Sequence, residues 1–141
     1  MITTAFRLFA AIFVGVLVAV VLLIAVELFS AVVHPFPEGF GGTEEEMCRH
    51  VERYPPWVLA VVVPAWAGAA FLSTWVARRL GNIYTAVGVG LLLLGSLVLN
   101  IAMLPYPLWF KIASSLAIPI AMIAGCRPLN WRRQASEGLP G

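Results

Sequence analysis

Charged side chains are scarce in this sequence, and aspartate is absent altogether. The 141 residues include nine basic and seven acidic side chains, so 11% of the chain is charged, whereas an ordinary soluble domain is about 25% charged. Hydrophobic residues make up 61%, which is more apolar surface than a soluble domain of this size could bury in one core. The composition argues against a soluble enzyme, a nucleic-acid-binding protein and a disordered chain, and it indicates an integral membrane protein.

Motifs that carry chemistry are also missing. The sequence has no Gly-x-Ser-x-Gly elbow, no Cys-x-x-Cys pair and no phosphate-binding glycine motif in a loop. Cys48 and His50 are two residues apart, so on a helix they would point to nearly opposite sides, and the spacing of zinc ligands is not met. We therefore expect no catalytic residues, no metal site and no cofactor, and hence no enzyme.

Four apolar runs are long enough to cross a bilayer, whose hydrocarbon core needs roughly 20 residues of helix. They cover residues 8–33, 57–77, 83–104 and 108–126. The first run is much longer than the apolar region of a signal peptide, which favours a retained span. The runs predict an all-α membrane protein in which residues 1–141 form a single domain, a four-transmembrane-helix bundle.

The distribution of basic residues predicts the orientation of this bundle, because cytoplasmic loops carry an excess of Lys and Arg. Six of the nine basic residues fall on one side of the spans, in the N-terminus, the loop after the second span and the tail at 127–141: Arg7, Arg78, Arg79, Arg127, Arg132 and Arg133. The loop at 34–56 lies on the opposite side and holds five of the seven glutamates. We expect both termini in the cytoplasm and this loop outside.

The outer loop contains a helix signal. Thr43 is followed three residues later by Glu46, which matches a capping box. This spacing predicts a short amphipathic helix at about 44–54, lying across the outer end of the bundle. Cys48 falls in this loop and Cys126 at the inner end of the fourth span, so the two cannot pair within one chain. Cys48 is either a free thiol, the plainer interpretation, or part of an intermolecular disulfide.

Only two charged residues fall inside the spans, Glu27 and Lys111. With a rise of about 1.5 Å per residue, Glu27, Asn100 and Lys111 lie at one depth near the outer surface, Ser114 lies one turn deeper, and His34 lies above Glu27. We expect Glu27 to face the bundle and either to pair with Lys111 or to hydrogen-bond to Asn100. A structural contact is the favoured interpretation of this polar layer, and a substrate or proton site is the alternative.

Small residues mark the faces on which helices pack closely in lipid. The sequence places them at helical spacing in all four spans: Ala11, Gly15, Ala19, Gly68, Gly90, Ala113, Ala117, Ala121 and Gly125. These faces serve either the packing of the bundle itself, which is the simpler interpretation, or the docking of a partner subunit.

Four stretches resemble a family of small four-span bacterial inner-membrane proteins to which no activity is assigned. They are Val-Val-His-Pro-Phe-Pro at 32–37, Tyr-Pro-Pro-Trp at 54–57, Trp-Ala-Gly at 66–68 and Asn-Ile-Ala-Met-Leu-Pro-Tyr-Pro at 100–107. The resemblance implies a bacterial inner membrane and carries no function. The small multidrug resistance transporters are similar only in size and span count, since their glutamate lies deep in the first span and Glu27 lies near its end.

From these observations we expect a non-catalytic integral membrane protein that acts as an accessory or interaction subunit of a membrane assembly. Its partners would be the lipid bilayer and either other membrane subunits or a second copy, with no nucleic acid. The alternative is a small oligomeric transporter or channel that uses the polar layer in the outer leaflet.

Overall fold

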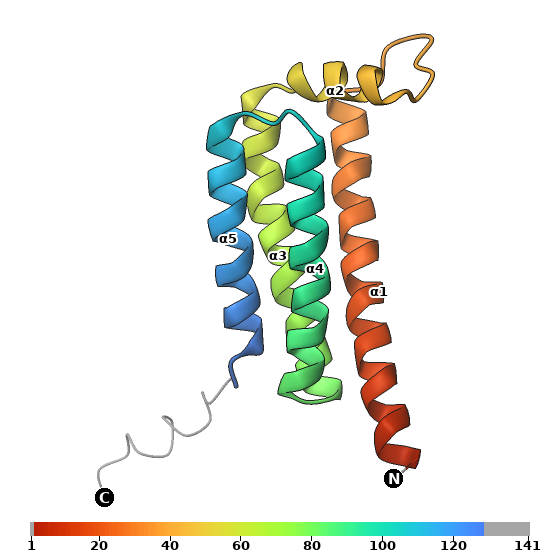
Figure 1. The fold of residues 1–141 in the computed structure, drawn as a ribbon, viewed down its shortest axis with the longest axis vertical. Helices are drawn as coiled ribbons and strands as arrows, with labels where there is room; N and C mark the ends of the chain where they lie inside the picture. Colours follow the sequence, from red (N-terminus) through yellow and green to blue (C-terminus); the bar gives the residue numbers. More distant parts are fainter. Residues whose placement is uncertain (1, 129–141) are drawn as a thin grey trace, which may run out of the picture.

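The computed structural model describes residues 2–128, which form five helices and no strand in that range (Figure 1). The helices are α1 (Ile2–Val33), α2 (Glu44–Glu52), α3 (Pro56–Leu80), α4 (Ile83–Met103) and α5 (Leu108–Cys126). All except α2 are long and apolar enough to cross a membrane. The prediction of an all-helical protein with four candidate spans is therefore confirmed. Residues 129–141, with Arg132 and Arg133, lie outside the described residues.

α1 and α3 extend beyond the apolar runs that predicted them, and polar contacts explain both extensions. α1 begins before residue 8 and passes through Arg7, whose Nε donates a hydrogen bond to the carbonyl of Leu80 at 2.9 Å. α3 continues past residue 77 to Leu80, where the N–H of Gly81 donates to the carbonyl of Ala77 at 2.9 Å. Both ends are thus held by hydrogen bonds that a hydropathy pattern does not register.

The capping box at the start of α2 is confirmed. The side chain of Thr43 accepts from the N–H of Glu46, and the side chain of Glu46 accepts from the N–H of Thr43. The helix ends at Glu52 and not at 54, because Arg53 and Tyr54 donate to carbonyls only three residues back, a tightened last turn that Pro55 follows.

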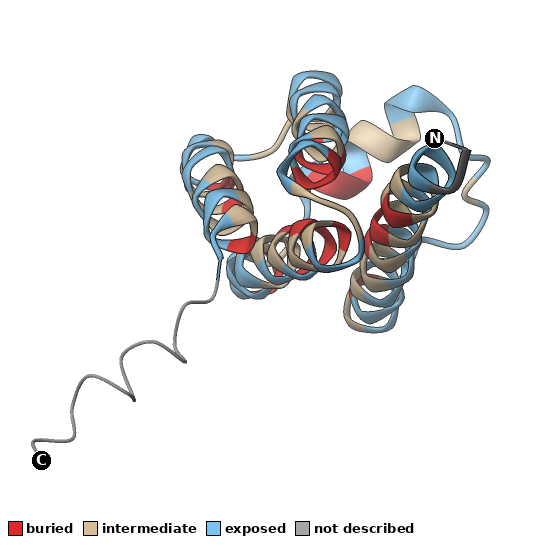
Figure 2. Ribbon diagram, turned by 90° about the horizontal axis from the view of Figure 1, so that it is seen from below, coloured by how far each residue is buried: buried red, intermediate tan, exposed pale blue. Residues whose placement is uncertain are grey.

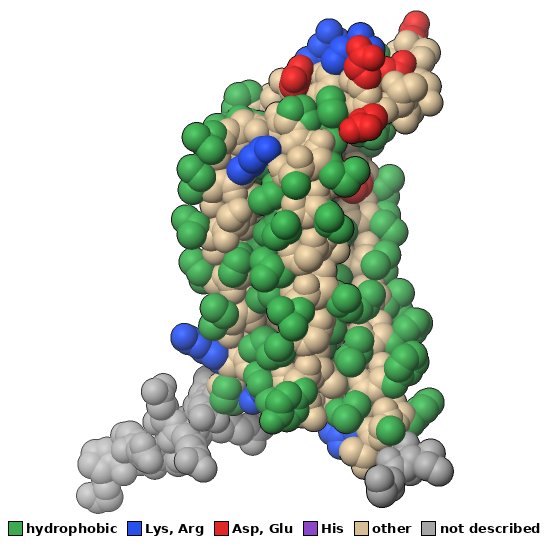
Figure 3. Space-filling view, viewed as in Figure 1, with side chains coloured by type: hydrophobic (Ala, Val, Ile, Leu, Met, Phe, Trp, Pro, Cys, Tyr) green, Lys and Arg blue, Asp and Glu red, His purple; other side chains and the backbone are tan. Residues whose placement is uncertain are grey.

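α3 is the central helix of the bundle. It contacts α1, α4 and α5, whereas α1 and α5 do not touch each other. We name the two ends of the bundle the α2 end and the arginine end, the latter carrying Arg7, Arg78, Arg79 and Arg127. Viewed along its length, the bundle has its buried residues on the helix sides that face one another (Figure 2). On the face in Figure 3, charged side chains gather at both ends and hydrophobic side chains cover much of the middle.

Toward the arginine end, small residues bring the helices into close contact. A Cβ added to Gly15 of α1 would lie 2.9 Å from Cβ of Ala77 and 3.0 Å from Cγ2 of Val89. A Cβ on Gly90 would lie 2.8 Å from Cε of Met122, and one on Gly125 would lie 2.6 Å from the carbonyl oxygen of Phe71. We call this region, centred on Gly15, Gly90 and Gly125, the glycine layer.

Most of the small residues that predicted the packing faces are buried or half-buried in the bundle. Ala11, Gly15 and Ala19 are buried along α1, and Gly90 and Gly125 are buried in the glycine layer. The other members of the α5 stripe, Ala113, Ala117 and Ala121, are half-buried, and Gly68 of α3 is exposed. The buried members pack within the bundle, which is the simpler of the two interpretations.

Candidate functional site

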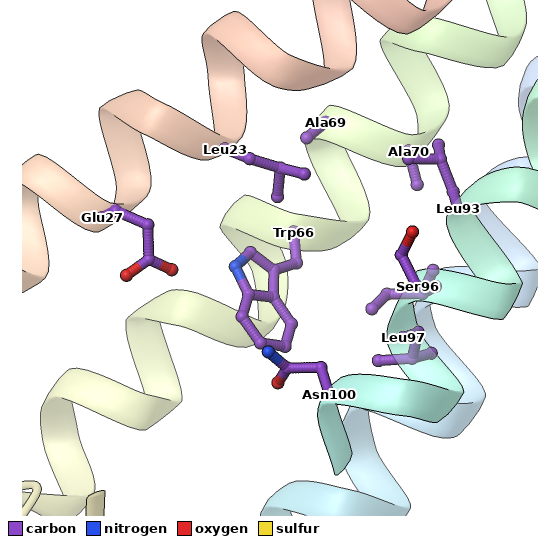
Figure 4. A pocket seen from close by; sticks show the side chains of 10 residues that line it. Leu23, Glu27, Trp66, Ala69, Ala70, Leu93, Ser96, Leu97 and Asn100 are labelled. Atoms are coloured by element: carbon purple, nitrogen blue, oxygen red, sulfur yellow. The ribbon is translucent and has the colours of Figure 1, made fainter. Parts of the chain in front are cut away.

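A cavity of about 160 Å³ lies between α1, α3 and α4, on the α2 side of the glycine layer (Figure 4). Its lining is mostly apolar, and its polar groups lie toward the α2 end. The lining residues come from all four long helices: Leu23, Glu27, Trp66, Ala69, Ala70, Leu93, Ser96, Leu97, Asn100 and Ile118. Glu27 and Asn100 lie within two turns of the α2 ends of their helices. They therefore share one cavity, as their common depth along the helices suggests.

The sequence around the cavity explains why the helices do not close here. α1 has no fully buried residue between Ala19 and Ser30, so its seam with α3 and α4 loosens after the glycine layer. α3 and α5 each carry an interior proline beside the lining, Pro64 near Trp66 and Pro119 after Ile118. A proline inside a helix removes a backbone hydrogen bond and disturbs the regular stacking of turns.

Two buried polar atoms at the cavity have no hydrogen-bond partner among the described residues, Nε1 of Trp66 and Oδ1 of Asn100. In Figure 4 the indole nitrogen lies on the side of the ring that faces Glu27, and the amide of Asn100 lies at the edge of the same ring. An unsatisfied buried donor or acceptor costs about 1–3 kcal/mol. Both atoms have almost no accessible surface, so these unsatisfied polar groups are packed into the wall of the cavity.

Glu27 is the one charged residue in the lining, and its carboxylate has no ion-pair partner. Across residues 2–128 a single ion pair is found, Arg49 with Glu45 at 3.9 Å on the surface of α2. The expected pairing of Glu27 with Lys111 is wrong, because Lys111 lies on α5, which does not contact α1. The side-chain hydrogen bonds found among residues 2–128 do not include one from the amide nitrogen of Asn100 to the carboxylate of Glu27 either.

An apolar cluster covers the cavity toward the α2 end. Val58, Leu59, Val62 and Phe110 are buried there, and the side chains of Tyr54, Trp66 and Tyr106 pack against them. The pKa values of Tyr54 and Tyr106 are raised, first by burial and then by the negative charge of Glu27. The apolar cluster thus separates the carboxylate of Glu27 from the α2 end, while Glu27 itself is exposed.

His34 and Ser114, two members of the expected polar layer, lie outside the cavity. The ring of His34 stacks on that of His50 with centroids 4.4 Å apart, and its Nε2 lies 3.3 Å from the carbonyl oxygen of His50. Burial, followed by the positive charge of His34, lowers the pKa of His50. The hydroxyl of Ser114 donates to the carbonyl of Phe110 at 2.7 Å within α5. Both residues have structural roles.

Trp66 is a member of the site that the sequence pattern did not predict. Its indole N–H is a donor in the middle of an apolar run, away from the run ends where tryptophan usually finds water. The position of this donor within the run is the feature of the sequence that could have indicated a polar site. The part of the chain that the structure describes contains no cluster of three or more His, Cys or Glu side chains placed to hold a metal ion.

No family model, no curated protein and no solved structure matches this chain. The geometry of the cavity is therefore the basis for a functional assignment.

Proposed function

We propose that this chain is a small membrane transporter or channel that takes a small polar or charged solute into the cavity at Glu27. The supporting observation is the cavity between the spans, whose one charged lining residue, Glu27, has no ion-pair partner among residues 2–128. Ionisable residues inside a membrane span are costly and usually mark pathways for protons, ions or substrates. A solute that pairs with the carboxylate of Glu27 would offset the cost of placing it within a span.

The proposed orientation places the α2 end outside a bacterial inner membrane and both termini in the cytoplasm. Arg7, Arg78, Arg79 and Arg127 lie at the arginine end, and five glutamates lie in the segment that contains α2. This asymmetry follows the excess of basic residues in cytoplasmic loops. The cavity would then lie in the outer leaflet, and α2 would be an extracytoplasmic helix.

An accessory subunit is the second candidate, and an apolar groove on the other side of the seam between α1 and α3 favours it. Ala25, Ala65 and Gly68 are among its lining residues, and a Cβ on Gly68 would meet nothing within 4 Å. Small residues that no other helix covers are suited to a helix of another subunit or of a second copy. The glycines at residues 15, 90 and 125 do not support an accessory subunit, because they pack against other helices inside the bundle.

Flux through proteoliposomes tests the proposal. We expect the purified protein to dissipate an imposed pH gradient, or to carry methylammonium, a small cationic solute, faster than empty liposomes do. Glu27→Gln should reduce this flux at least tenfold, while Glu52→Gln, an exposed glutamate on α2, should leave it unchanged. Flux no faster than in empty liposomes for both probes, or flux that is unaffected by Glu27→Gln, would overturn the proposal.

The mass of the protein extracted in mild detergent separates the two candidates. A homo-oligomer agrees with a transporter or channel. A stoichiometric complex with other membrane proteins, together with no flux, would favour the accessory subunit.

A further inference from the structure

We infer that two copies of this chain pair across α4, so that Glu27 of each copy lies against Lys111 of the partner subunit and each cavity lies at the interface. Both side chains carry charge inside a candidate span, where charge is costly and is usually balanced by a group of opposite sign. Neither has such a partner among residues 2–128, whose single ion pair is Arg49 with Glu45. The dimer forms whether or not the cavity carries a solute.

The two charges lie at similar depths in the bundle. α1 ends at Val33 and α5 begins at Leu108, so Glu27 and Lys111 lie about 9 Å and about 5 Å from the α2 ends of their helices, at a rise of about 1.5 Å per residue. A lysine side chain is long and flexible enough to span this difference. Charges at one depth meet between copies only if the copies stand parallel, with both α2 ends on the same side.

Both charges also lie on the side of the bundle that carries α4. Glu27 lines the cavity together with residues of α4. On α5, Lys111 shares one helical stripe with Ile118 and Met122, and these two side chains pack against α4. Figure 1 draws α4 in front of α3, with α5 and α1 on either side. A two-fold axis in front of α4, parallel to the long helices, therefore brings α1 of each copy toward α5 of the other, and both pairs form together.

This shared face favours a closed pair over a ring. In a ring each copy presents different surfaces to its two neighbours, which would require Glu27 and Lys111 on opposite sides of the bundle. A two-fold pair uses the same surface twice, and one surface that carries both charges is complementary to itself.

The outer face of α4 suits the centre of this interface. Gly88, Gly95 and Ala102 follow one another at intervals of seven residues, and a Cβ added to either glycine would meet nothing within 4 Å. Small residues let two helices approach closely in lipid, and the interval matches the heptad of two nearly parallel helices. Leu92 and Leu99, which are 58% and 64% exposed in one copy, would be covered beside them.

The partner subunit also completes the cavity. Glu27 is exposed, while Ala69, Ala70 and Leu97 across the cavity are buried, so the cavity opens beside Glu27, at the interface. The ammonium of the partner's Lys111 would neutralise Glu27 there. Under the proposed function, a cationic solute would displace this ammonium.

Charge reversal in the full chain, followed by native mass spectrometry over a dilution series in mild detergent, tests the pairing. Glu27→Lys puts two ammonium groups at each contact and Lys111→Glu puts two carboxylates there, so each variant should raise the dissociation constant of the dimer at least tenfold. An equimolar mixture of the two variants should form heterodimers, because each contact then joins an ammonium to a carboxylate. Pairing within one chain would not give this result. Glu52→Lys, the same change on the exposed side of α2, is the matched control and should leave the dimer unchanged.

Disulfide cross-linking in membranes locates the contact. In a chain that carries Cys48→Ser and Cys126→Ser, Gly95→Cys on the outer face of α4 should give cross-linked dimers, and Gly68→Cys on the exposed side of α3 should not. The inference would be overturned by a monomer in both assays, by reversed variants that dimerise as well as the parent chain, by a mixture without heterodimers, or by cross-linking through Gly68→Cys alone. Flux through a monomer would overturn this inference alone, whereas a dimer without flux would overturn the proposed transport alone.

Discussion

The glycine layer and the cavity are built from the same helices, yet they treat polar groups in opposite ways. In the glycine layer the hydroxyl of Ser73 donates to the carbonyl of Ala69 at 2.5 Å, that of Thr74 to Ala70 at 2.8 Å, and that of Thr85 to Ala77 at 2.8 Å. About two to three turns toward the α2 end, Trp66 and Asn100 each leave a buried atom unpartnered, and Glu27 has no counter-ion among the described residues. The glycine layer satisfies its own polar groups, and the region around the cavity does not.

Side-chain length explains this difference. The hydroxyls of Ser73 and Thr74 reach carbonyls four residues back on their own helix, and that of Thr85 reaches the carbonyl of Ala77 on the neighbouring helix, so each finds an acceptor at short range. Such short side chains also let the backbones approach, as Gly15 does against Ala77 and Val89. The polar atoms of Glu27, Trp66 and Asn100 lie at the ends of longer side chains that face away from their own backbones. These atoms need a partner from elsewhere, and the longer side chains keep the helices apart.

The largest effect is expected from filling the glycine layer. Gly15→Val should lower the free energy of unfolding by about 1–3 kcal/mol, the usual cost of overpacking, because Ala77, Val89 and the carbonyl of Ser73 already lie within 3.2 Å of an added Cβ. Thermal unfolding in detergent measures the change. The matched control is Gly68→Val, where the added Cβ meets nothing within 4 Å and the expected change is within about 0.5 kcal/mol. Equal losses in the two variants would mean that the two regions pack alike.

A smaller change of opposite sign is expected at the cavity. Asn100→Leu keeps the approximate size of the side chain and removes the unpartnered Oδ1, so the free energy of unfolding should rise by about 1 kcal/mol. The same assay applies, with Ser73→Ala as the comparison, since that variant removes a satisfied hydroxyl and should not stabilise the protein. A clear loss of stability in Asn100→Leu would show that Asn100 already has a partner and that the cavity is as self-contained as the glycine layer.

Much of the glycine layer and half of the site could be predicted from the sequence, because both depend on position along a helix. The rise per residue placed Glu27 and Asn100 at one depth, and the spacing of Gly15 with Ala11 and Ala19 marked a packing face. The predicted pairing of Glu27 with Lys111 was wrong because a pairing also depends on the order of the helices around the bundle. Equal depth does not say which helices are neighbours, and α3 separates α1 from α5.

Trp66 was missed for a different physical reason. A hydropathy pattern counts the indole as apolar surface, which most of it is, and ignores its single N–H donor. Only the packing shows whether that donor finds an acceptor. The same holds for the open seam around it, which follows from which faces of α1 and α4 meet and not from the composition of either helix.

The smallest expected effect is a dependence on pH that is confined to the cover of the cavity. The lowered pKa of His50 means that the stacked arrangement favours the neutral ring. A released α2 would bind more protons once the pH falls below about 6.5, the ordinary value for histidine. The stack therefore contributes stability above that pH and loses it as the pH falls further. The charged groups beside the stack, Glu38, Glu46, Arg49 and Arg53, line the adjoining groove and act on both states.

Hydrogen exchange at pH 7.5 and pH 5.5, corrected for the intrinsic rates, localises this effect. Amides of α2 should exchange faster in acid, while those of α3 around Ser73 should not change, because the glycine layer contains no histidine. His50→Phe keeps an aromatic ring against Phe36 and Tyr54, which lie 4.4 Å and 5.4 Å from His50 between ring centroids, and it removes the titrating group. If α2 of His50→Phe still loosened in acid, or if the glycine layer loosened equally, the cover would not depend on this histidine. A response limited to α2 means that acid uncovers the end of the cavity and leaves the self-contained part of the bundle intact.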